Sequence, residues 1–212
     1  MDASFGAYML LGILGAGDID MSTAAQKQQM AHVIYMQEAR RDRQGRLQIY
    51  RPPANDGGGA YEVAGINVRY HPKEAAALRD LIRAGEHEAA EERVKQYMLA
   101  YTDVVLTWGD MDAGIEMFLR DSAFNRGPGG AAMILQLALG NVTVDGIVGP
   151  KTKAAFAEAD KSKLLDKLKW ARRQYEVRKG IRSNFIKGLE ARWTRVLLAA
   201  RELRKEDQHD DS

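Results

Sequence analysis

The chain has 212 residues with a formal net charge of +2, and 45% of its residues are hydrophobic. This length and composition fit a folded protein with one good core or two small ones, and they exclude a chain that is disordered over most of its length. Because the sequence has no cysteine and its four histidines are scattered, a disulfide framework and a thiolate metal site are excluded, and we expect neither a metal nor a cofactor.

The first predicted element is a helix in an uncharged run of thirteen residues, 5–17. The run is shorter than a bilayer-spanning helix, and it follows Asp2 instead of the basic segment that begins a signal peptide. We therefore expect a helix packed on the protein, with an atypical export signal as the alternative. On this interpretation the protein is synthesised in the cytoplasm without a clear signal peptide and does not insert stably into a membrane.

The second predicted helix spans residues 22–38, with a Ser-Thr cap at its start and apolar residues at helical spacing. Its last residue, Glu38, lies at the end of the apolar stripe, so its carboxyl is expected to be partly buried. Burial disfavours the ionised form of a carboxyl, which suits a group that donates a proton near neutral pH. The alternative is that Glu38 caps its helix by pairing with Arg40 or Arg41.

A turn, a short strand and a glycine loop are predicted next, in residues 40–45, 47–50 and 52–59. Asp56 and Glu62 flank the three glycines of the loop. Two carboxylates on a loop that returns toward a third are typical of glycoside hydrolysis, in which one acts as acid and another positions water or stabilises an oxocarbenium-like state. Glu38, Asp56 and Glu62 are therefore the candidate catalytic residues.

The rest of the chain gives mainly helix signals, beginning with Pro72 at the first turn of a helix. Further helices are expected over residues 88–105, 110–122, 129–139, 151–159, 161–179 and 184–203. The sequence therefore predicts a protein that is nearly all α.

Charge is concentrated near the C-terminus. Residues 161–205 hold 15 Lys/Arg against four Asp/Glu, a local balance of +11. A basic helical face attracts polyanions such as nucleic acid, anionic lipid or the carboxylates of a cell wall, although it can also be only the solvated face of a long helix. We expect no nucleic-acid partner, because the sequence has no helix-turn-helix pattern, stacking-aromatic motif or zinc module.

The N-terminal third resembles the Glu-Gly-Gly type N-acetylmuramidases (glycoside hydrolase family 108), which are lysozyme-like enzymes. Glu38 at a helix end, the glycine loop at 56–59 and the later Gly65-Ile66 pair carry the resemblance. The sequence departs from the family where Ala39-Arg40 replaces two glycines and where Tyr61-Glu62 replaces a threonine.

The resemblance implies a peptidoglycan hydrolase that cleaves the β-1,4 bond between N-acetylmuramic acid and N-acetylglucosamine. Glu38 would be the general acid, and Asp56 or Glu62 would stabilise charge or activate water. In this part of the chain, the residues implied to bind the glycan are Gly57, Gly58, Gly59 and Tyr61.

The C-terminal half resembles the peptidoglycan-binding domain that accompanies these muramidases, through Phe124-Asn125, Gln136, Asp145-Gly146 and Gly149-Pro150. The resemblance implies that Asn125, Gln136 and Asp145 contact the substrate. Local physics offers another explanation, since Asp-Gly favours a left-handed turn and Pro150 starts a helix, so much of the motif can serve the fold. Trp193 is expected to be a core residue, with a sugar-stacking role as the alternative.

Together these features predict an all-α, lysozyme-like fold with a short strand and glycine loop near residues 45–66. A muramidase-like part would occupy residues 1–108, a peptidoglycan-binding part 109–205 and an acidic tail 206–212. Bacterial peptidoglycan is the expected partner of a monomer. The alternatives are a noncatalytic peptidoglycan-binding or phage structural protein that retains the fold, and a nucleic-acid-binding protein that uses the basic segment.

Overall fold

The structure is a computed structural model that describes residues 22–53, 59–180 and 183–210, with side chains in the last segment described from 186 to 205. The helix expected at 5–17 lies outside the described residues. The observed helices are α1 (Ala24–Glu38), α2 (Pro72–Arg83), α3 (His87–Thr102), the 3-10 helix η1 (Asp103–Thr107), α4 (Ala113–Leu139), α5 (Pro150–Glu158), α6 (Lys161–Arg178) and α7 (Ser183–Asp210). The predicted all-α, lysozyme-like fold class is confirmed.

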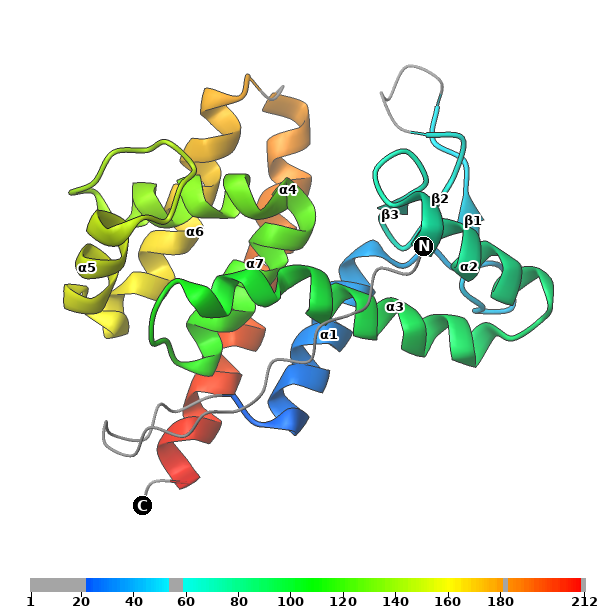
Figure 1. Cartoon of the computed structure of the whole chain (residues 1–212), viewed down its shortest axis with the longest axis horizontal. Coiled ribbons are helices and arrows are strands. Elements are labelled where there is room, and N and C mark those ends of the chain that lie inside the picture. The colour runs from blue at the N-terminus through cyan, green and yellow to red at the C-terminus, as the bar shows by residue number, and fades with distance from the viewer. Residues whose placement is uncertain (1–21, 54–58, 181–182, 211–212) are drawn as a thin grey trace, which may run out of the picture.

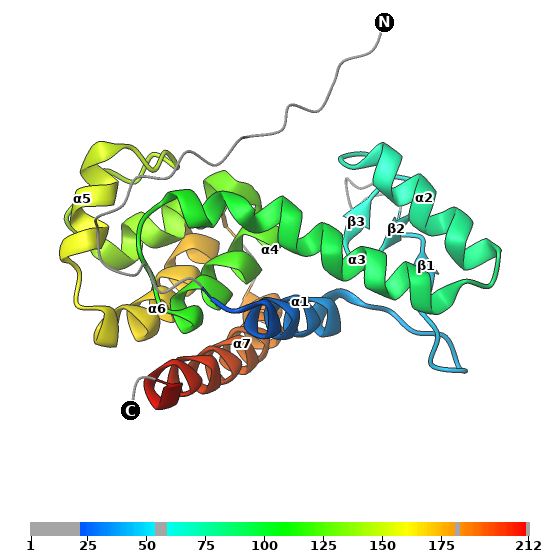
Figure 2. The same cartoon turned by 60° about the horizontal axis from the view of Figure 1, so that its bottom comes forward.

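Helix α4 crosses the middle of the molecule, with α5 and α6 at one end and the small sheet with α2 at the other (Figure 1). It packs against α6 and α7 on one side and against α1 and α3 on another, as the second view also shows (Figure 2). One apolar cluster joins buried residues from both sides of the expected boundary at residue 108. No helix among the described residues is long and apolar enough to cross a membrane.

Helix α1 begins and ends where the sequence predicts. A capping box starts it, because the Thr23 hydroxyl accepts from the Gln26 amide at 3.2 Å and the Gln26 side chain accepts from the Thr23 amide at 2.8 Å. It ends after Glu38, because Ala39 is extended. Its buried face includes Met30 and Ile34, which anchor α1 in the core and fix the position of Glu38.

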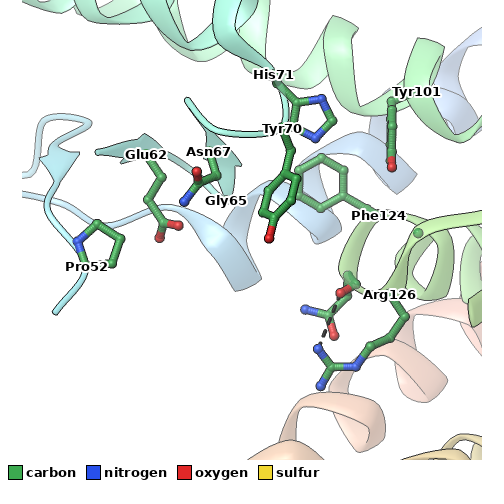
Figure 3. Close-up of a pocket in the computed structure, with 11 residues that line it drawn as sticks. Pro52, Glu62, Gly65, Asn67, Tyr70, His71, Tyr101, Phe124 and Arg126 are labelled. Carbon is green, nitrogen blue, oxygen red and sulfur yellow. Dashed lines mark hydrogen bonds between the residues drawn. The ribbon is translucent and has the colours of Figure 1, made fainter. Parts of the chain in front are cut away.

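A three-stranded antiparallel sheet follows, in the order β1 (Ile49–Tyr50), β2 (Glu62–Val63) and β3 (Ile66–Asn67). The predicted strand at 47–50 is present as β1, whereas β2 and β3 were not predicted. Ala64 and Gly65 join β2 to β3 with φ of 47° and 76°, the two positive φ values of a type I′ hairpin turn. The hairpin presents Glu62 and Gly65 at the edge of the sheet that faces α4 (Figure 3).

The two helices predicted at 110–122 and 129–139 are present as the two arms of α4, which meet at a kink, and the first arm extends further than predicted. Residues 124–126 are helical, and only Gly127 departs from helical geometry, with φ of 72° and ψ of 164°. Pro128 follows, and its ring cannot continue the regular hydrogen-bond ladder, which explains a kink here. The kink exposes a turn of α4 to the space beside the sheet.

The C-terminal helix α7 runs further than the predicted end at residue 203, to Asp210. It therefore includes most of the expected acidic tail. Trp193 is buried, with 1% of its surface exposed, so its prediction as a core residue is confirmed.

Candidate active site

A cleft of about 870 Å³ lies between the sheet and the kink of α4. Figure 3 shows Glu62 and Asn67 on the sheet side, with Phe124 and Arg126 on the α4 side. The residues that line the cleft are Pro52, Glu62, Gly65, Asn67, Tyr70, His71, Tyr101, Phe124, Asn125, Arg126 and Gly127. This mixture of aromatic and polar side chains can bind a ligand that has both apolar faces and hydrogen-bonding groups.

Glu38 lies directly beside this cleft. Its Oε1 accepts a hydrogen bond from Asn125 Nδ2 at 3.3 Å, and its Oε2 is 3.0 Å from where a Cβ on Gly65 would stand. Both Asn125 and Gly65 line the cleft. The side chain is 17% exposed, which agrees with the expected partial burial.

The partner of Glu38 is Arg192 of α7, whose Nη1 lies 2.5 Å from Oε1. The alternative in which Glu38 pairs with Arg40 or Arg41 is therefore wrong. Arg41 instead pairs with Glu91 at 2.8 Å, and the guanidinium of Arg40 lies over a tyrosine ring. Both described contacts of Glu38, from Asn125 and Arg192, use Oε1, and no donor among the described residues contacts Oε2.

Buried charges behind Glu38 hold this arrangement. Arg192 Nη2 donates to Asp121 Oδ1 at 2.8 Å. Burial works against the charge of Arg192, but the Asp121 and Glu38 carboxylates outweigh it and raise the pKa of the guanidinium. Arg172, fully buried, donates to Asn125 Oδ1 at 2.7 Å. This bond turns the amide nitrogen of Asn125 toward Glu38.

Sequence reasoning did not assign these buried charged residues to the site. Arg192 shares the inward face of α7 with Val196 and Ala200, and Arg172 shares the inward face of α6 with Leu168. A charged residue at a position that the helical period places inside is the signal that could have found them, because such residues are almost never buried without a partner.

An aromatic wall closes one side of the cleft. The rings of His71 and Tyr101 meet edge to face with centroids 5.1 Å apart, and Tyr101 meets Phe124 in the same way at 6.2 Å. Tyr97 Oη lies 2.7 Å from His71 Nδ1. Burial lowers the pKa of His71 and raises that of Tyr97, so at neutral pH the phenol is protonated and the imidazole is uncharged.

The predicted glycine loop is only partly described. Asp56, Gly57 and Gly58 lie outside the described residues. The amide of Gly59 donates to Asn67 Oδ1 at 2.9 Å, and a Cβ there would meet Val68 at 2.6 Å, so this glycine permits a close approach within the protein itself.

Tyr61, just before β2, and Glu62, the first residue of β2, differ in position. Tyr61 is partly buried and does not line the cleft; its ring lies 5.4 Å from the guanidinium of Arg79. Glu62 does line the cleft. The structure thus brings together Glu38, Glu62 and Asn125 among the predicted site residues.

Gln136 and Asp145 lie away from the cleft, in the loop at 140–149 and the helix before it. Gln136 Nε2 donates to Asp145 Oδ1 at 2.7 Å and to the Ile147 carbonyl at 3.0 Å. Its Oε1 accepts from the amides of Asp145 and Gly146 at 3.0 and 2.9 Å. These bonds fix the loop, while Asp145 also borders a second hollow of about 1130 Å³.

Comparison with known proteins adds to this geometry. A family model described as "Predicted Peptidoglycan domain" matches residues 130–193. Through this segment the protein is peptidoglycan-related. The matched segment contains Gln136, Asp145, Arg172 and Arg192, whereas Glu38 and Glu62 precede it.

Structural comparison shows the same fold in another protein. The chain is similar to a solved structure of SagA from Brucella abortus, with a TM-score of 0.58 and 22% sequence identity. The similarity covers 85% of this chain and 95% of SagA. Among curated proteins, none matches the sequence.

Proposed function

We propose that the protein is a peptidoglycan hydrolase that cleaves the β-1,4 bond between N-acetylmuramic acid and N-acetylglucosamine, with Glu38 as general acid. The observation that carries the proposal is the pairing of two carboxyl groups at one cleft. Glu62 lines it, and Glu38 accepts a hydrogen bond from the lining residue Asn125 and fills the space where a side chain on the lining residue Gly65 would stand. Hydrolysis of a glycosidic bond typically uses such a pair. One carboxyl group protonates the leaving oxygen, and the other stabilises positive charge on the sugar or activates water.

The contacts of Glu38 suit proton donation on one side only. Arg192 and Asn125 hold Oε1, while Oε2 is directed at Gly65, where the backbone carries no side chain. A proton on Oε2 would therefore lie next to a residue that lines the cleft. Glu62, on the sheet, would stabilise positive charge on the sugar or activate water.

The walls of the cleft suit a glycan. Tyr101 and Phe124 offer aromatic surface to the apolar face of a sugar ring. His71, Asn67 and Asn125 supply hydrogen-bonding groups for its hydroxyl and acetamido groups. The match of residues 130–193 to a predicted peptidoglycan domain supports peptidoglycan as the source of that glycan.

The test is release of soluble muropeptides from purified peptidoglycan sacculi, followed by reduction of the new sugar ends to identify them. The wild type should release products with reducing muramic-acid ends. Glu38→Gln should lower the rate by about 100-fold or more, the usual effect of losing a general acid, and Glu62→Gln should lower it less. Glu202→Gln is the matched control and should leave the rate unchanged, because Glu202 lies on the exposed surface of α7 and Lys205 is its one ion-pair partner among the described residues.

Thermal unfolding of each variant is measured beside the rate, because Glu38 also partners the buried Arg192. A variant that is folded but inactive supports the catalytic role. Wild-type protein that releases no reducing ends from sacculi would refute the hydrolase.

A second candidate is a noncatalytic peptidoglycan-binding protein, and the ion pair between Glu38 and Arg192 favours it. A carboxylate held at 2.5 Å by a buried guanidinium can serve the fold alone. In that case wild type and Glu38→Gln both bind sacculi and leave them intact, and the substitution changes only the stability.

A further inference from the structure

The α4 side of the cleft carries a guanidinium, that of Arg126, immediately before the kink. Its Nε donates to Glu176 Oε1 at 2.5 Å, and its Nη1 lies 3.4 Å from the Asn125 carbonyl oxygen. No acceptor among the described residues contacts Nη2, and 26% of the side chain is exposed. Arg126 lines the cleft, so part of its hydrogen-bonding edge is available to a ligand (Figure 3).

The carboxylate that anchors Arg126 is shared. Glu176 Oε1 also lies 3.8 Å from Arg172 Nε. Burial lowers the pKa of Arg172 to about 10. The Asp121 carboxylate opposes this shift, whereas the positive charges of Arg192 and Arg126 add to it. The guanidinium therefore stays positive at neutral pH. Glu176 therefore faces two guanidiniums.

Charge in the whole cluster balances only while Glu38 is ionised. The cluster contains three guanidiniums and three carboxylates, namely those of Arg126, Arg172, Arg192, Glu38, Asp121 and Glu176. A general acid must carry its proton before it reacts. Protonation of Glu38 would leave one net positive charge beside the cleft, and an anionic group of the ligand at Arg126 would compensate it.

The sheet side of the cleft, opposite Arg126, carries a carboxylate and is less suited to an anionic group of the ligand. Glu62 lies on the sheet side of the cleft and Arg126 on the α4 side, and the aromatic side chains of Tyr70 and Phe124 also line it (Figure 3). A carboxylate next to Glu62 would be repelled, whereas one next to Arg126 would form a charge-assisted hydrogen bond. The two charges therefore fix which end of a ligand enters which side.

We propose that Arg126 binds a carboxylate on the side arm of the muramic-acid unit, so that the cleft selects muramic-acid glycan over a neutral polymer of N-acetylglucosamine. The inference rests on the proposed function, since it names the part of the substrate that this cleft recognises. Two sources offer the same chemistry. The lactyl group carries a free carboxylate in a peptide-free strand, and the stem peptide carries carboxylates in an intact one.

The test is calorimetric measurement of the binding of soluble ligands to the Glu38→Gln protein. This variant cannot cleave the ligands if Glu38 is the acid, and its neutral side chain has the charge of a protonated Glu38. Three ligands of equal sugar number are compared: N-acetylglucosamine tetramer, a peptide-free muramic-acid tetrasaccharide and a peptide-bearing one. We expect the carboxylate-bearing ligands to bind about tenfold tighter than the neutral tetramer, with the difference shrinking at high salt. Whichever of the two binds tighter identifies the source of the carboxylate.

Adding Arg126→Gln should abolish the preference and leave the affinity for the neutral tetramer unchanged. Arg126→Lys, which keeps the charge beside Glu176 but loses the planar fork, should retain part of the preference and guards against misfolding of the glutamine variant. Arg201→Gln is the matched control, because Arg201 pairs with Asp166 on the exposed surface and neither residue lines the cleft.

Equal affinity for all three ligands, or an equal loss for all three on Arg126→Gln, would overturn the inference. Binding is measured without cleavage, so the two proposals can fail separately. A wild type that hydrolyses no sacculi but retains the Arg126-dependent preference would refute the hydrolase and support the carboxylate site.

Discussion

The cleft and the loop at 140–149 both hold polar residues that the sequence marks as binding residues, but the two regions use them differently. At the loop, Gln136 of α4 uses its side-chain amide for groups no more than 16 positions away, including the backbone of Asp145 and Gly146. In the cleft, Glu38 is held from α7 by Arg192, 154 positions away. The polar groups of the loop motif bond to groups nearby in the sequence, whereas the cleft depends on elements that the whole fold brings together.

The difference shows which of the two regions has groups to offer a ligand. Every described bond of Gln136 ends on the loop or on the start of α5. Beside the cleft, Glu38 Oε2 and Arg126 Nη2 have no partner among the described residues. A recognisable motif can therefore be a device of the fold, while the reactive groups lie where no local motif points.

The largest expected effect comes from Asp121→Ala, which breaks the support of the cleft. Asp121 is buried and contacts the guanidiniums of both Arg192 and Arg172, so its loss leaves buried positive charge with too few partners. We expect the free energy of unfolding to fall by about 3–5 kcal/mol in urea denaturation. Asp166→Ala, in the exposed pair with Arg201, should change it by about 0.5 kcal/mol or less. Similar losses in the two variants would contradict a special role for the buried cluster.

Gln136→Ala should destabilise the other region, the loop at 140–149. It removes the amide that binds Asp145, Gly146, Ile147 and Thr152, and it leaves partly buried groups of the loop and the buried Thr152 hydroxyl without this partner. The expected loss is about 2–3 kcal/mol, accompanied by faster hydrogen exchange at the Gly146 amide. Cleavage of sacculi below the unfolding temperature should remain at the wild-type rate. A folded Gln136→Ala protein that no longer acts on sacculi would show that the loop serves more than the fold.

The contrast also explains what the sequence could predict. The helix ending at Glu38 and the burial of Trp193 follow from capping and periodicity, which are local properties. Strand β1 was found because it lies in an alternating run at 47–50, whereas β2 and β3 were missed because the tight turn at Ala64 and Gly65 leaves only two strand residues on each side of it. The partner of Glu38 was missed because no local spacing links α1 to α7.

A pair of glycine substitutions separates the two regions more finely. Gly65 and Gly140 have φ of 76° and 78°, so alanine is strained at both, by about 1–2 kcal/mol. A Cβ at Gly65 would lie 3.0 Å from Glu38 Oε2 and 3.2 Å from Phe124, whereas one at Gly140 would have nothing within 4 Å. Gly65→Ala should therefore reduce muropeptide release as well as stability, and Gly140→Ala stability alone. Equal rates for the two folded variants would argue against a reacting Oε2.

The smallest effect is a pH dependence confined to the loop. The hydrogen bond from Gln136, followed by that from the Ile147 amide, holds the pKa of Asp145 below its usual range. Because the folded-state pKa is the lower one, its stabilising contribution is present above about pH 4, the unfolded value, and is lost as the pH falls through the folded value. The melting temperature of Asp145→Asn should therefore lie below that of the wild type at neutral pH, and the gap should narrow below about pH 4. A difference in melting temperature that stays constant down to pH 2 would mean that the loop tolerates a neutral Asp145. The hydrogen bonding that holds the loop would then depend on Gln136 and the backbone alone.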